Sequence, residues 1–313
     1  EFAPLLPNET EEMIFSVITP EQKEIFLQTK ELDLSLSIEG LDARFRVNVF
    51  FQRGTVSGAF RNLPLQVPTL EELNLPPVLK DFCNLLQGFV LITGPTGQGK
   101  STTLASMIRK INETRAVHVV TIEDPIEFVF PHGKALIEQR EMNFDTTSWA
   151  LALRSALRED PDVVLVGEMR DFETISSAVT IAETGHLVLA TLHTNSAAQS
   201  IDRIIDVFPE SQQSQIRTQL AVTLHGIVSQ RLIPDLSGGR VPAVEILLAS
   251  PAVRNVIREQ KTYQIDNVIS TSYDLGMISL ERSLAQLVKD GRISVEEAKL
   301  HTVKPAELSR LLR

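Results

Sequence analysis

The fold of this chain is decided by the stretch Gly94-Pro95-Thr96-Gly97-Gln98-Gly99-Lys100-Ser101. It fits the phosphate-binding pattern G-x-x-x-x-G-K-S/T without a gap. The apolar run 89–92 before it predicts a buried strand, and residues 102–110 after it have helical composition. A strand, a glycine-rich loop and a helix in this order form a P-loop. A chance match in an ordinary glycine turn is the alternative, and the flanking strand and helix count against it.

Each part of this loop has a predicted role. Glycines let backbone N–H groups approach phosphate oxygens, and the helix N-terminus favours an anion. Lys100 would reach the β- and γ-phosphates, and Ser101 would hold Mg²⁺. ATP and Mg²⁺ are therefore the predicted cofactors. We expect the nucleotide to be bound by Gly94, Thr96, Gly97, Gln98, Gly99, Lys100, Ser101 and Thr102.

Composition narrows the class of protein. The chain has 313 residues, which is enough for about two domains. Its net charge of −10 argues against a broad nucleic-acid-binding surface, so no nucleic-acid partner is expected. No apolar run approaches the roughly 20 residues that span a bilayer, and no signal-peptide pattern opens the chain. Cys83 is the one cysteine, which favours a reducing compartment and excludes a four-cysteine zinc site. We expect Cys83 to be buried.

The first 62 residues predict a small α/β domain. Residues 21–29 have a helical pattern with Pro20 near the start. Three strand-like runs follow at 32–38, 43–51 and 55–60, separated by turn signals at Glu39-Gly40 and Arg53-Gly54. An antiparallel meander is the expected arrangement. The chain opens at Glu1-Phe2 without a methionine, so we expect this domain to be incomplete.

Four prolines between residues 63 and 77 indicate a linker, and we place a hinge there. From about residue 78 to the end at 313, strand patterns alternate with helical ones. This alternation predicts a mostly parallel sheet with helices on both faces. After about residue 250 the pattern is helical, with segments at 278–289 and 295–300. The buried-strand candidates are 89–92, 117–122, 163–166 and 187–191.

Two acidic residues follow buried strands, at the sheet edge where ligands bind. Residues 163–166 lead through Gly167 to Glu168. Glu168 would hold Mg²⁺ through a water molecule or polarise the attacking water. Glu123, in the run 121–127, would share this role. The alternatives are a solvated carboxylate for Glu168 and a strand-end turn at Asp124-Pro125 for the second motif.

Histidines and arginines complete the candidate set. His193 stands between two threonines near a strand end, where it can contact a γ-phosphate. For His186 a functional role and a structural role are equally consistent with the sequence. Guanidinium groups suit phosphate oxygens, so arginines of the first domain could reach a neighbouring subunit's nucleotide in a ring. Their spacing alone is typical of an exposed strand face. The arginines concerned are Arg44, Arg46, Arg53 and Arg61.

Four motifs together resemble the secretion-superfamily ATPases that power type II secretion and type IV pili. They are GPTGQGKST (94–102), TIEDPIEF (121–128), DPDVVLVGEMRD (160–171) and ETGHLVLATLHTNSA (183–197). The resemblance implies a RecA-like P-loop NTPase domain behind a truncated PAS-like N-terminal domain. It implies that Glu168 is the catalytic Walker B glutamate, Glu123 the Asp-box acid and His193 the His-box histidine. It also implies that Arg46 and Arg61 reach the nucleotide. Gln98 departs from the family, which usually has serine there.

The segment AVRNVIRE (252–259) resembles a signature of the pilus retraction branch of this family, with Val253 and Val256 as conservative departures. The branch implies a cytoplasmic homohexamer at the inner face of the cytoplasmic membrane. Such a hexamer hydrolyses ATP to drive pilus retraction and twitching motility, acting on a membrane-embedded platform protein. Helix 252–259 is then a candidate coupling element. A related secretion or pilus-assembly ATPase is the alternative, and a RecA-like DNA motor or a non-catalytic nucleotide-binding module is a more distant one.

Overall fold

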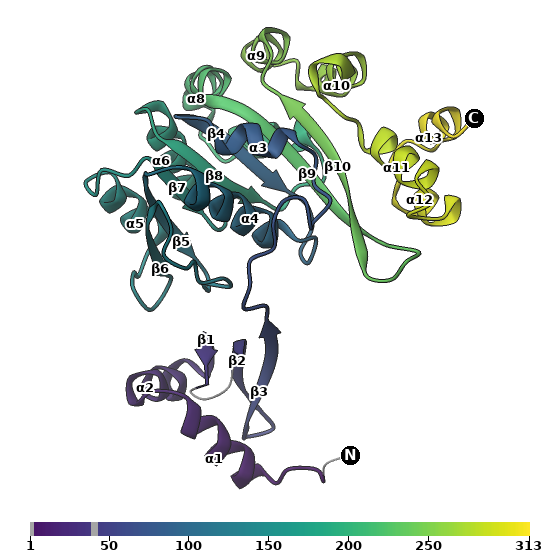
Figure 1. Ribbon diagram of the computed structural model, residues 1–313. Coiled ribbons are helices and arrows are strands. Elements are labelled where there is room, and N and C mark those ends of the chain that lie inside the picture. The colour runs from purple at the N-terminus through teal and green to yellow at the C-terminus, as the bar shows by residue number, and fades with distance from the viewer. Residues whose placement is uncertain (1–2, 39–42) are drawn as a thin grey trace. The chain divides into compact units, whose positions relative to one another are not determined.

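The computed structural model describes residues 3–38 and 43–313. The chain divides into two compact units. The first is Glu1–Val67 with Asp124–Phe130, and the second is Pro68–Glu123 with Pro131–Arg313. Residues 124–130 were not expected in the first unit, because their sequence continues a strand of the second. The hinge at 63–77 stays a prediction. Figure 1 shows the elements of both units.

The first unit is a three-stranded antiparallel sheet with two helices. Its elements are α1 (Pro7–Val17), α2 (Pro20–Thr29), β1 (Glu31–Ser37), β2 (Arg44–Gln52) and β3 (Thr55–Leu63). The predicted helix and three strands are confirmed, whereas the predicted turn at Glu39-Gly40 lies outside the described residues. Helix α1 was missed because its first turns are polar and only Ile14 is buried. Ile14 packs with Phe26 and Val47 in the core of this unit.

The second unit is built on a seven-stranded sheet. Its strands are β4 (Gly88–Thr93), β5 (His118–Glu123), β6 (Leu136–Glu141), β7 (Val163–Val166), β8 (Leu187–Leu192), β9 (Leu224–Pro234) and β10 (Arg240–Leu248). Their order in the sheet is β10-β9-β4-β8-β7-β5-β6. Strands β4 to β9 pair in parallel, and their buried apolar runs explain why the sequence showed them so clearly. Strand β10 is antiparallel to β9, because the short turn between them cannot make a parallel crossover.

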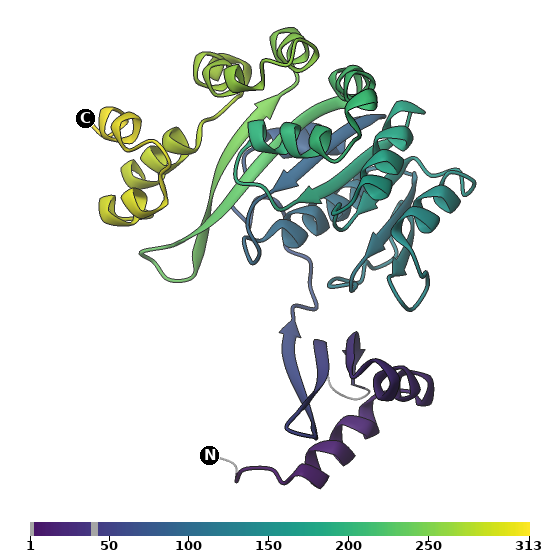
Figure 2. The same cartoon turned by 180° about the vertical axis from the view of Figure 1, so that it is seen from behind.

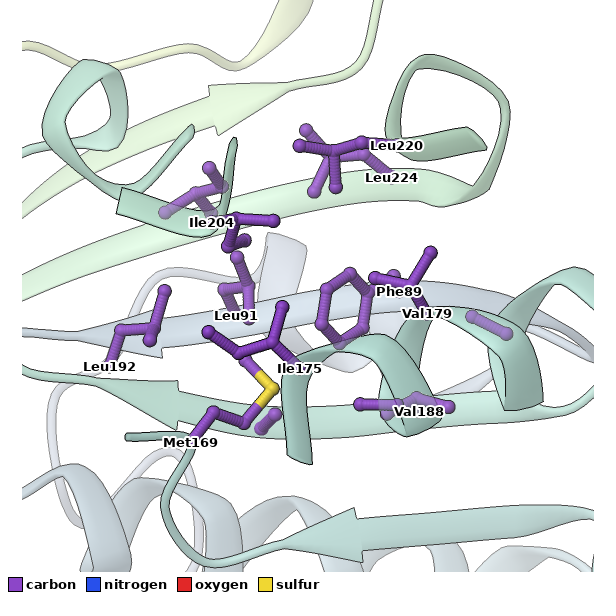
Figure 3. Close-up of a cluster of buried hydrophobic side chains, with 14 of the residues drawn as sticks. Phe89, Leu91, Met169, Ile175, Val179, Val188, Leu192, Ile204, Leu220 and Leu224 are labelled. Atoms are coloured by element: carbon purple, nitrogen blue, oxygen red, sulfur yellow. The ribbon is translucent and has the colours of Figure 1, made fainter. Parts of the chain in front are cut away.

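Helices cover both faces of this sheet, as predicted. The view of Figure 1 has α3 (Val78–Cys83) and α4 (Lys100–Thr114) over one face. The opposite face, seen in Figure 2, carries α6 (Phe172–Glu183), α7 (Ala197–Asp206) and α8 (Glu210–Thr223). Figure 3 shows Phe89 and Leu91 of β4 packed between residues of these three helices. Helix α5 (Trp149–Ala156) joins the same core. Cys83 is buried, as expected.

The chain ends in short helices. Helix α9 (Pro251–Arg258) adds Val253 and Ile257 to the main core. Helices α11 (Leu280–Lys289), α12 (Val295–His301) and α13 (Pro305–Leu311) form a smaller core with Ile233 of β9 and Val241 of β10. The helices predicted at 278–289 and 295–300 are thereby confirmed. The remaining elements are α10 (Ile265–Thr271) and two 3₁₀ turns, Thr262–Gln264 and Tyr273–Leu275. None of the helices in the described residues is long and apolar enough to cross a membrane.

The strand order positions the candidate site. Strands β4, β8, β7 and β5 are consecutive neighbours and run in parallel, so their carboxyl ends share one edge of the sheet. The P-loop follows β4, His193 follows β8, Glu168 follows β7 and Glu123 ends β5. Groups that are up to about 100 positions apart in the chain are therefore delivered to one edge.

Candidate nucleotide site

The P-loop connects β4 to α4 over residues 94–99. Gly94, Gly97 and Gly99 have φ values of 144°, 79° and 81°, in the region that favours glycine. A Cβ on Gly94 would lie 2.4 Å from the backbone oxygen of Gln230, and one on Gly99 would lie 2.9 Å from the Gln230 Nε2. A Cβ on Gly97 would meet nothing within 4 Å. Two glycines thus let the loop approach β9, while the loop is open at Gly97.

Lys100 begins helix α4, and its ammonium group turns back onto the loop. Its Nζ donates to the carbonyl oxygens of Gly94 at 2.8 Å and Pro95 at 3.0 Å. A compact ammonium on a flexible stem can exchange these carbonyls for phosphate oxygens. Ser101 and Thr102 follow in the first turn of α4, where helix N–H groups favour an anion. The side chain of Lys100 is thus held at the loop that the sequence motif predicted it would serve.

His193 joins the P-loop to Glu168. Its Nε2 lies 3.0 Å from the Glu168 Oε1, and its Nδ1 lies 3.3 Å from the Thr96 Oγ1. Glu168 reaches this position because Gly167 docks on β5, with its N–H donating to the Ile122 oxygen at 2.8 Å. The structure therefore brings together three predicted site residues from three different strand ends.

The protonation of His193 follows from its surroundings. Partial burial lowers the pKa of His193, the positive charge of Lys100 lowers it further, and Glu168 opposes both effects. The lowered pKa favours the neutral imidazole. Its contacts assign the proton to Nε2, which donates to Glu168, and leave Nδ1 to accept from the Thr96 hydroxyl. A neutral imidazole in this tautomer orients the carboxylate without neutralising it.

Arg170 holds the other side of the Glu168 carboxylate. Its Nε lies 2.5 Å from Oε1 and its second terminal nitrogen lies 2.7 Å from Oε2. The Arg170 side chain is 75% exposed, and an ion pair this exposed is weak enough to be displaced. Sequence reasoning did not identify Arg170 as a site residue, although it lies inside the motif 160–171. Its position two residues after Glu168 could have indicated it.

Glu123 occupies the end of β5. Its Oε1 accepts from the Thr121 hydroxyl at 2.7 Å and from the Gln139 amide at 3.0 Å. A Cβ on Gly167 would lie 3.3 Å from the Glu123 Cα, so the two acidic strand ends are immediate neighbours. The catalytic role of Glu123 stays a prediction. Its carboxylate is oriented by two neutral donors.

The candidate arginines lie in the first unit. Arg46 of β2 and Arg61 of β3 stand directly opposite each other in the strand register. Arg46 lies 3.7 Å from the Glu127 Oε1, whereas Arg61 is exposed. Like charges placed opposite each other are unfavourable, and the Glu127 carboxylate beside Arg46 offsets part of this repulsion. The reach of the two arginines to the nucleotide stays a prediction.

The remaining candidates serve local structure. Arg44 donates to the Ser35 hydroxyl at 2.8 Å and to the Ile126 oxygen at 3.1 Å, so it holds the segment 124–130. Arg53 lies in the β2–β3 turn with φ 49°. The His186 Nδ1 lies 3.0 Å from the Ile181 oxygen near the end of α6, which favours the structural alternative for this histidine.

Strand β9 supports the loop through residues that the motifs did not indicate. Thr93 donates to the Ser229 hydroxyl at 2.9 Å, and Thr103 donates to the Gln230 Oε1 at 2.8 Å. The Gln230 Nε2 donates in turn to the Gln98 oxygen at 2.7 Å. Gln230 is 3% exposed. The sequence signal for this support was a polar Ser-Gln pair within an otherwise apolar run.

Helix α9 contains the segment 252–259. Arg254 donates to the backbone oxygens of Ala221, of Val222 at 2.6 Å and of Ala249 at 3.1 Å. Ala221 and Val222 belong to the last turn of α8, so the guanidinium caps that helix. The segment as a coupling element stays a prediction, but the side chain of Arg254 is engaged within the second unit.

Comparison with known proteins decides the family. Residues 33–300 match the type II/IV secretion system protein family. The chain belongs to this family. It is 48% identical to the type IV pilus retraction ATPase PilT of Pseudomonas aeruginosa, over 95% of this chain and 86% of the relative. It is 50% identical to a twitching motility protein of Neisseria gonorrhoeae, over 93% of this chain and 78% of the relative.

Solved structures agree with the sequence comparison. The crystal structure of the pilus retraction motor PilT with bound ADP matches with a TM-score of 0.89 and 47% identity. The match covers 96% of this chain and 85% of that one. The ATPase DotB of Legionella pneumophila matches with a TM-score of 0.84 and 30% identity, over 96% of this chain and 84% of that one. The predicted family and fold are thereby confirmed.

Proposed function

We propose that this chain is an ATP-hydrolysing motor of type IV pilus retraction. Support comes from the relatives, which include a pilus retraction ATPase and a twitching motility protein at 48% and 50% identity. The observation that carries the proposal is the connection through His193. This residue lies 3.3 Å from Thr96 in the P-loop and 3.0 Å from Glu168, so phosphate cradle and acidic group form one site.

The nucleotide would be bound at the P-loop. Its phosphates would accept from the loop N–H groups and from Lys100, which would release the carbonyls of Gly94 and Pro95. Mg²⁺ fits the donor set, because the Ser101 hydroxyl is a hard oxygen ligand at the start of α4. Within the described residues no cluster of three or more potential ligands could hold a metal alone, so nucleotide oxygens and water would supply the other ligands. Bound there, the ion would neutralise phosphate charge.

Hydrolysis needs a base that accepts a proton from the attacking water. Glu168 would perform this role, because it lies at the carboxyl edge of β7 and is linked to the P-loop. Arg170 bonds both oxygens of the Glu168 carboxylate, and an attacking water would need one of them as its acceptor. Arg170 would leave Glu168 as the triphosphate arrives. The His193 Nε2–H would keep the carboxylate oriented meanwhile.

Work requires that the nucleotide state changes the arrangement of the two units. Arg46 and Arg61 would supply positive charge to the phosphoryl group, from the first unit of the same or a neighbouring subunit. The chain passes into the first unit directly after Glu123, at Asp124, so an acidic strand end of the site is covalently joined to a segment that Arg44 holds. In a homohexamer with hinges at 63–77, this linkage would convert hydrolysis into a movement of the first unit. That movement would act on a platform protein at the cytoplasmic face of the inner membrane.

The substitution Glu168→Gln tests the proposal. We expect ATP binding within about threefold of wild type, because the P-loop is intact. Turnover should fall by a factor of about 10² to 10⁴, which is the usual contribution of a general base. A wild-type rate in this variant would refute the assignment of the base. Complementation of a retraction-deficient strain by the wild-type chain tests the pilus role, and unrestored twitching would favour a related secretion or assembly ATPase.

A further inference from the structure

Gln98 makes two bonds to strand β9 from the middle of the P-loop. Its side-chain Oε1 accepts from the Leu232 backbone N–H at 2.6 Å. Its backbone oxygen accepts from the Gln230 Nε2 at 2.7 Å. Gln98 is only partly exposed, and Gln230 is 3% exposed. Gln98 is thus attached to β9 through both its side chain and its backbone.

The Leu232 N–H is available to Gln98 because β9 extends beyond the end of β4. The pairing of β4 with β9 ends at Thr93 opposite Ser229, while β9 continues to Pro234. On its other side, Leu232 stands opposite Pro242 of β10, which has no N–H to exchange. Such a pair cannot be one of the hydrogen-bonded pairs of an antiparallel ladder, so the Leu232 N–H points away from β10. The Gln98 carboxamide accepts from this N–H beyond the last pair of β4 with β9.

Both bonds orient the peptide that links Gln98 to Gly99. In a trans peptide the C=O and the following N–H point in opposite directions. Because the Gln98 C=O points to Gln230 on the β9 side, the Gly99 N–H points away from β9. A phosphate would approach from that side. The attachment to β9 therefore presents a phosphate-binding N–H before the nucleotide arrives.

We propose that Gln98 is a positioning residue that keeps the P-loop of the nucleotide-free protein in its binding conformation. This inference rests on the proposed nucleotide-binding function of the same loop. When a binding-competent state is only partly populated, the apparent Kd equals the intrinsic Kd divided by the populated fraction. Loss of the anchor should therefore weaken ADP and ATP equally, since both present a β-phosphate to the loop. Loss of the anchor should leave the kcat unchanged, because bound nucleotide holds the loop in its binding conformation.

The test compares Gln98→Met with Gln212→Met, a matched change at an exposed position of α8. Methionine keeps the length of the side chain but cannot accept from Leu232. We expect Gln98→Met to raise the Kd of ADP and the KM of ATP about three- to tenfold, the range of one lost hydrogen bond. The kcat should stay within twofold, and Gln212→Met should match wild type. Gln98→Ser, whose hydroxyl is too short to reach Leu232, should behave like Gln98→Met.

Amide hydrogen exchange without nucleotide gives a second readout. The Leu232 amide should exchange at least about tenfold faster in Gln98→Met than in wild type, because its acceptor is gone. An unchanged Kd with unchanged Leu232 protection would overturn the inference. A fall in kcat at constant KM would also overturn it, since Gln98 would then act on the reacting phosphate. Failure of the proposed function looks different: wild type would not bind ADP, or Lys100→Ala would bind it equally well.

Discussion

Replacement of Arg254 by methionine should destabilise the second unit. The guanidinium donates to the carbonyls of Ala221 and Val222 at the end of α8 and to that of Ala249. A hydrogen bond to a charged group contributes about 1.5–3 kcal/mol, and a cation at a helix C-terminus contributes about 0.3–1 kcal/mol. Val222 is 63% exposed, so its carbonyl can turn to water, whereas Ala221 is fully buried. We therefore expect a net loss of about 2 kcal/mol.

For a domain of this size, about 1 kcal/mol lowers the Tm by about 2–4 °C. Arg254→Met should thus melt about 4–8 °C below wild type in a thermal scan followed by circular dichroism. Arg258→Met is the matched control, because Arg258 is exposed on the same helix, and its effect should stay within about 0.5 kcal/mol. The Tm of Arg254→Lys should fall between those of the two variants, since lysine keeps the positive charge but lacks the several fixed N–H donors of a guanidinium.

A Tm of Arg254→Met within about 1 °C of wild type would refute the capping argument. The result also decides how the coupling hypothesis for helix 252–259 should be tested. A twitching defect caused by an Arg254 variant would mix lost stability with lost coupling. Arg258 offers the cleaner probe, because its side chain is exposed and its replacement should leave the fold intact.

Three further outcomes follow from the charges. In an NMR titration the pKa of His193 should lie below its ordinary 6.5, and Lys100→Ala should raise it whereas Glu168→Gln should lower it further. Burial raises the pKa of Glu245 to about 7 from 4.5. The stabilisation of the folded state by the neutral carboxyl is therefore fully present below pH 4.5 and is lost as the pH rises through 7. Glu245→Gln should reduce the resulting fall in Tm between about pH 5 and 8. Arg170→Ala should change the Tm by less than about 2 °C and the Kd of ATP by less than about threefold, because its pair with Glu168 is exposed and lies outside the phosphate cradle; a loss of ATP binding would place Arg170 on the nucleotide instead.

Local sequence was sufficient wherever the determining interactions are local. The P-loop glycines, the apolar parallel strands and the acidic residues that end them all follow from short-range pattern, and the structure confirms these elements. Pattern failed where burial depends on distant partners. Helix α1 buries only Ile14, and residues 124–130 join the first unit through Arg44 and Arg46 rather than through their own composition.

By itself, then, the sequence determined the family, the phosphate-binding loop and the residue types that the chemistry needs, because these depend on neighbours along the chain. Only the tertiary structure decided which of those residues meet. The strand order puts His193 between Thr96 and Glu168, and the length of β9 leaves an N–H for Gln98. The physical reason is that strand neighbours are chosen by packing of the whole sheet, and hydrogen bonds across more than a hundred residues leave no periodic trace in the chain.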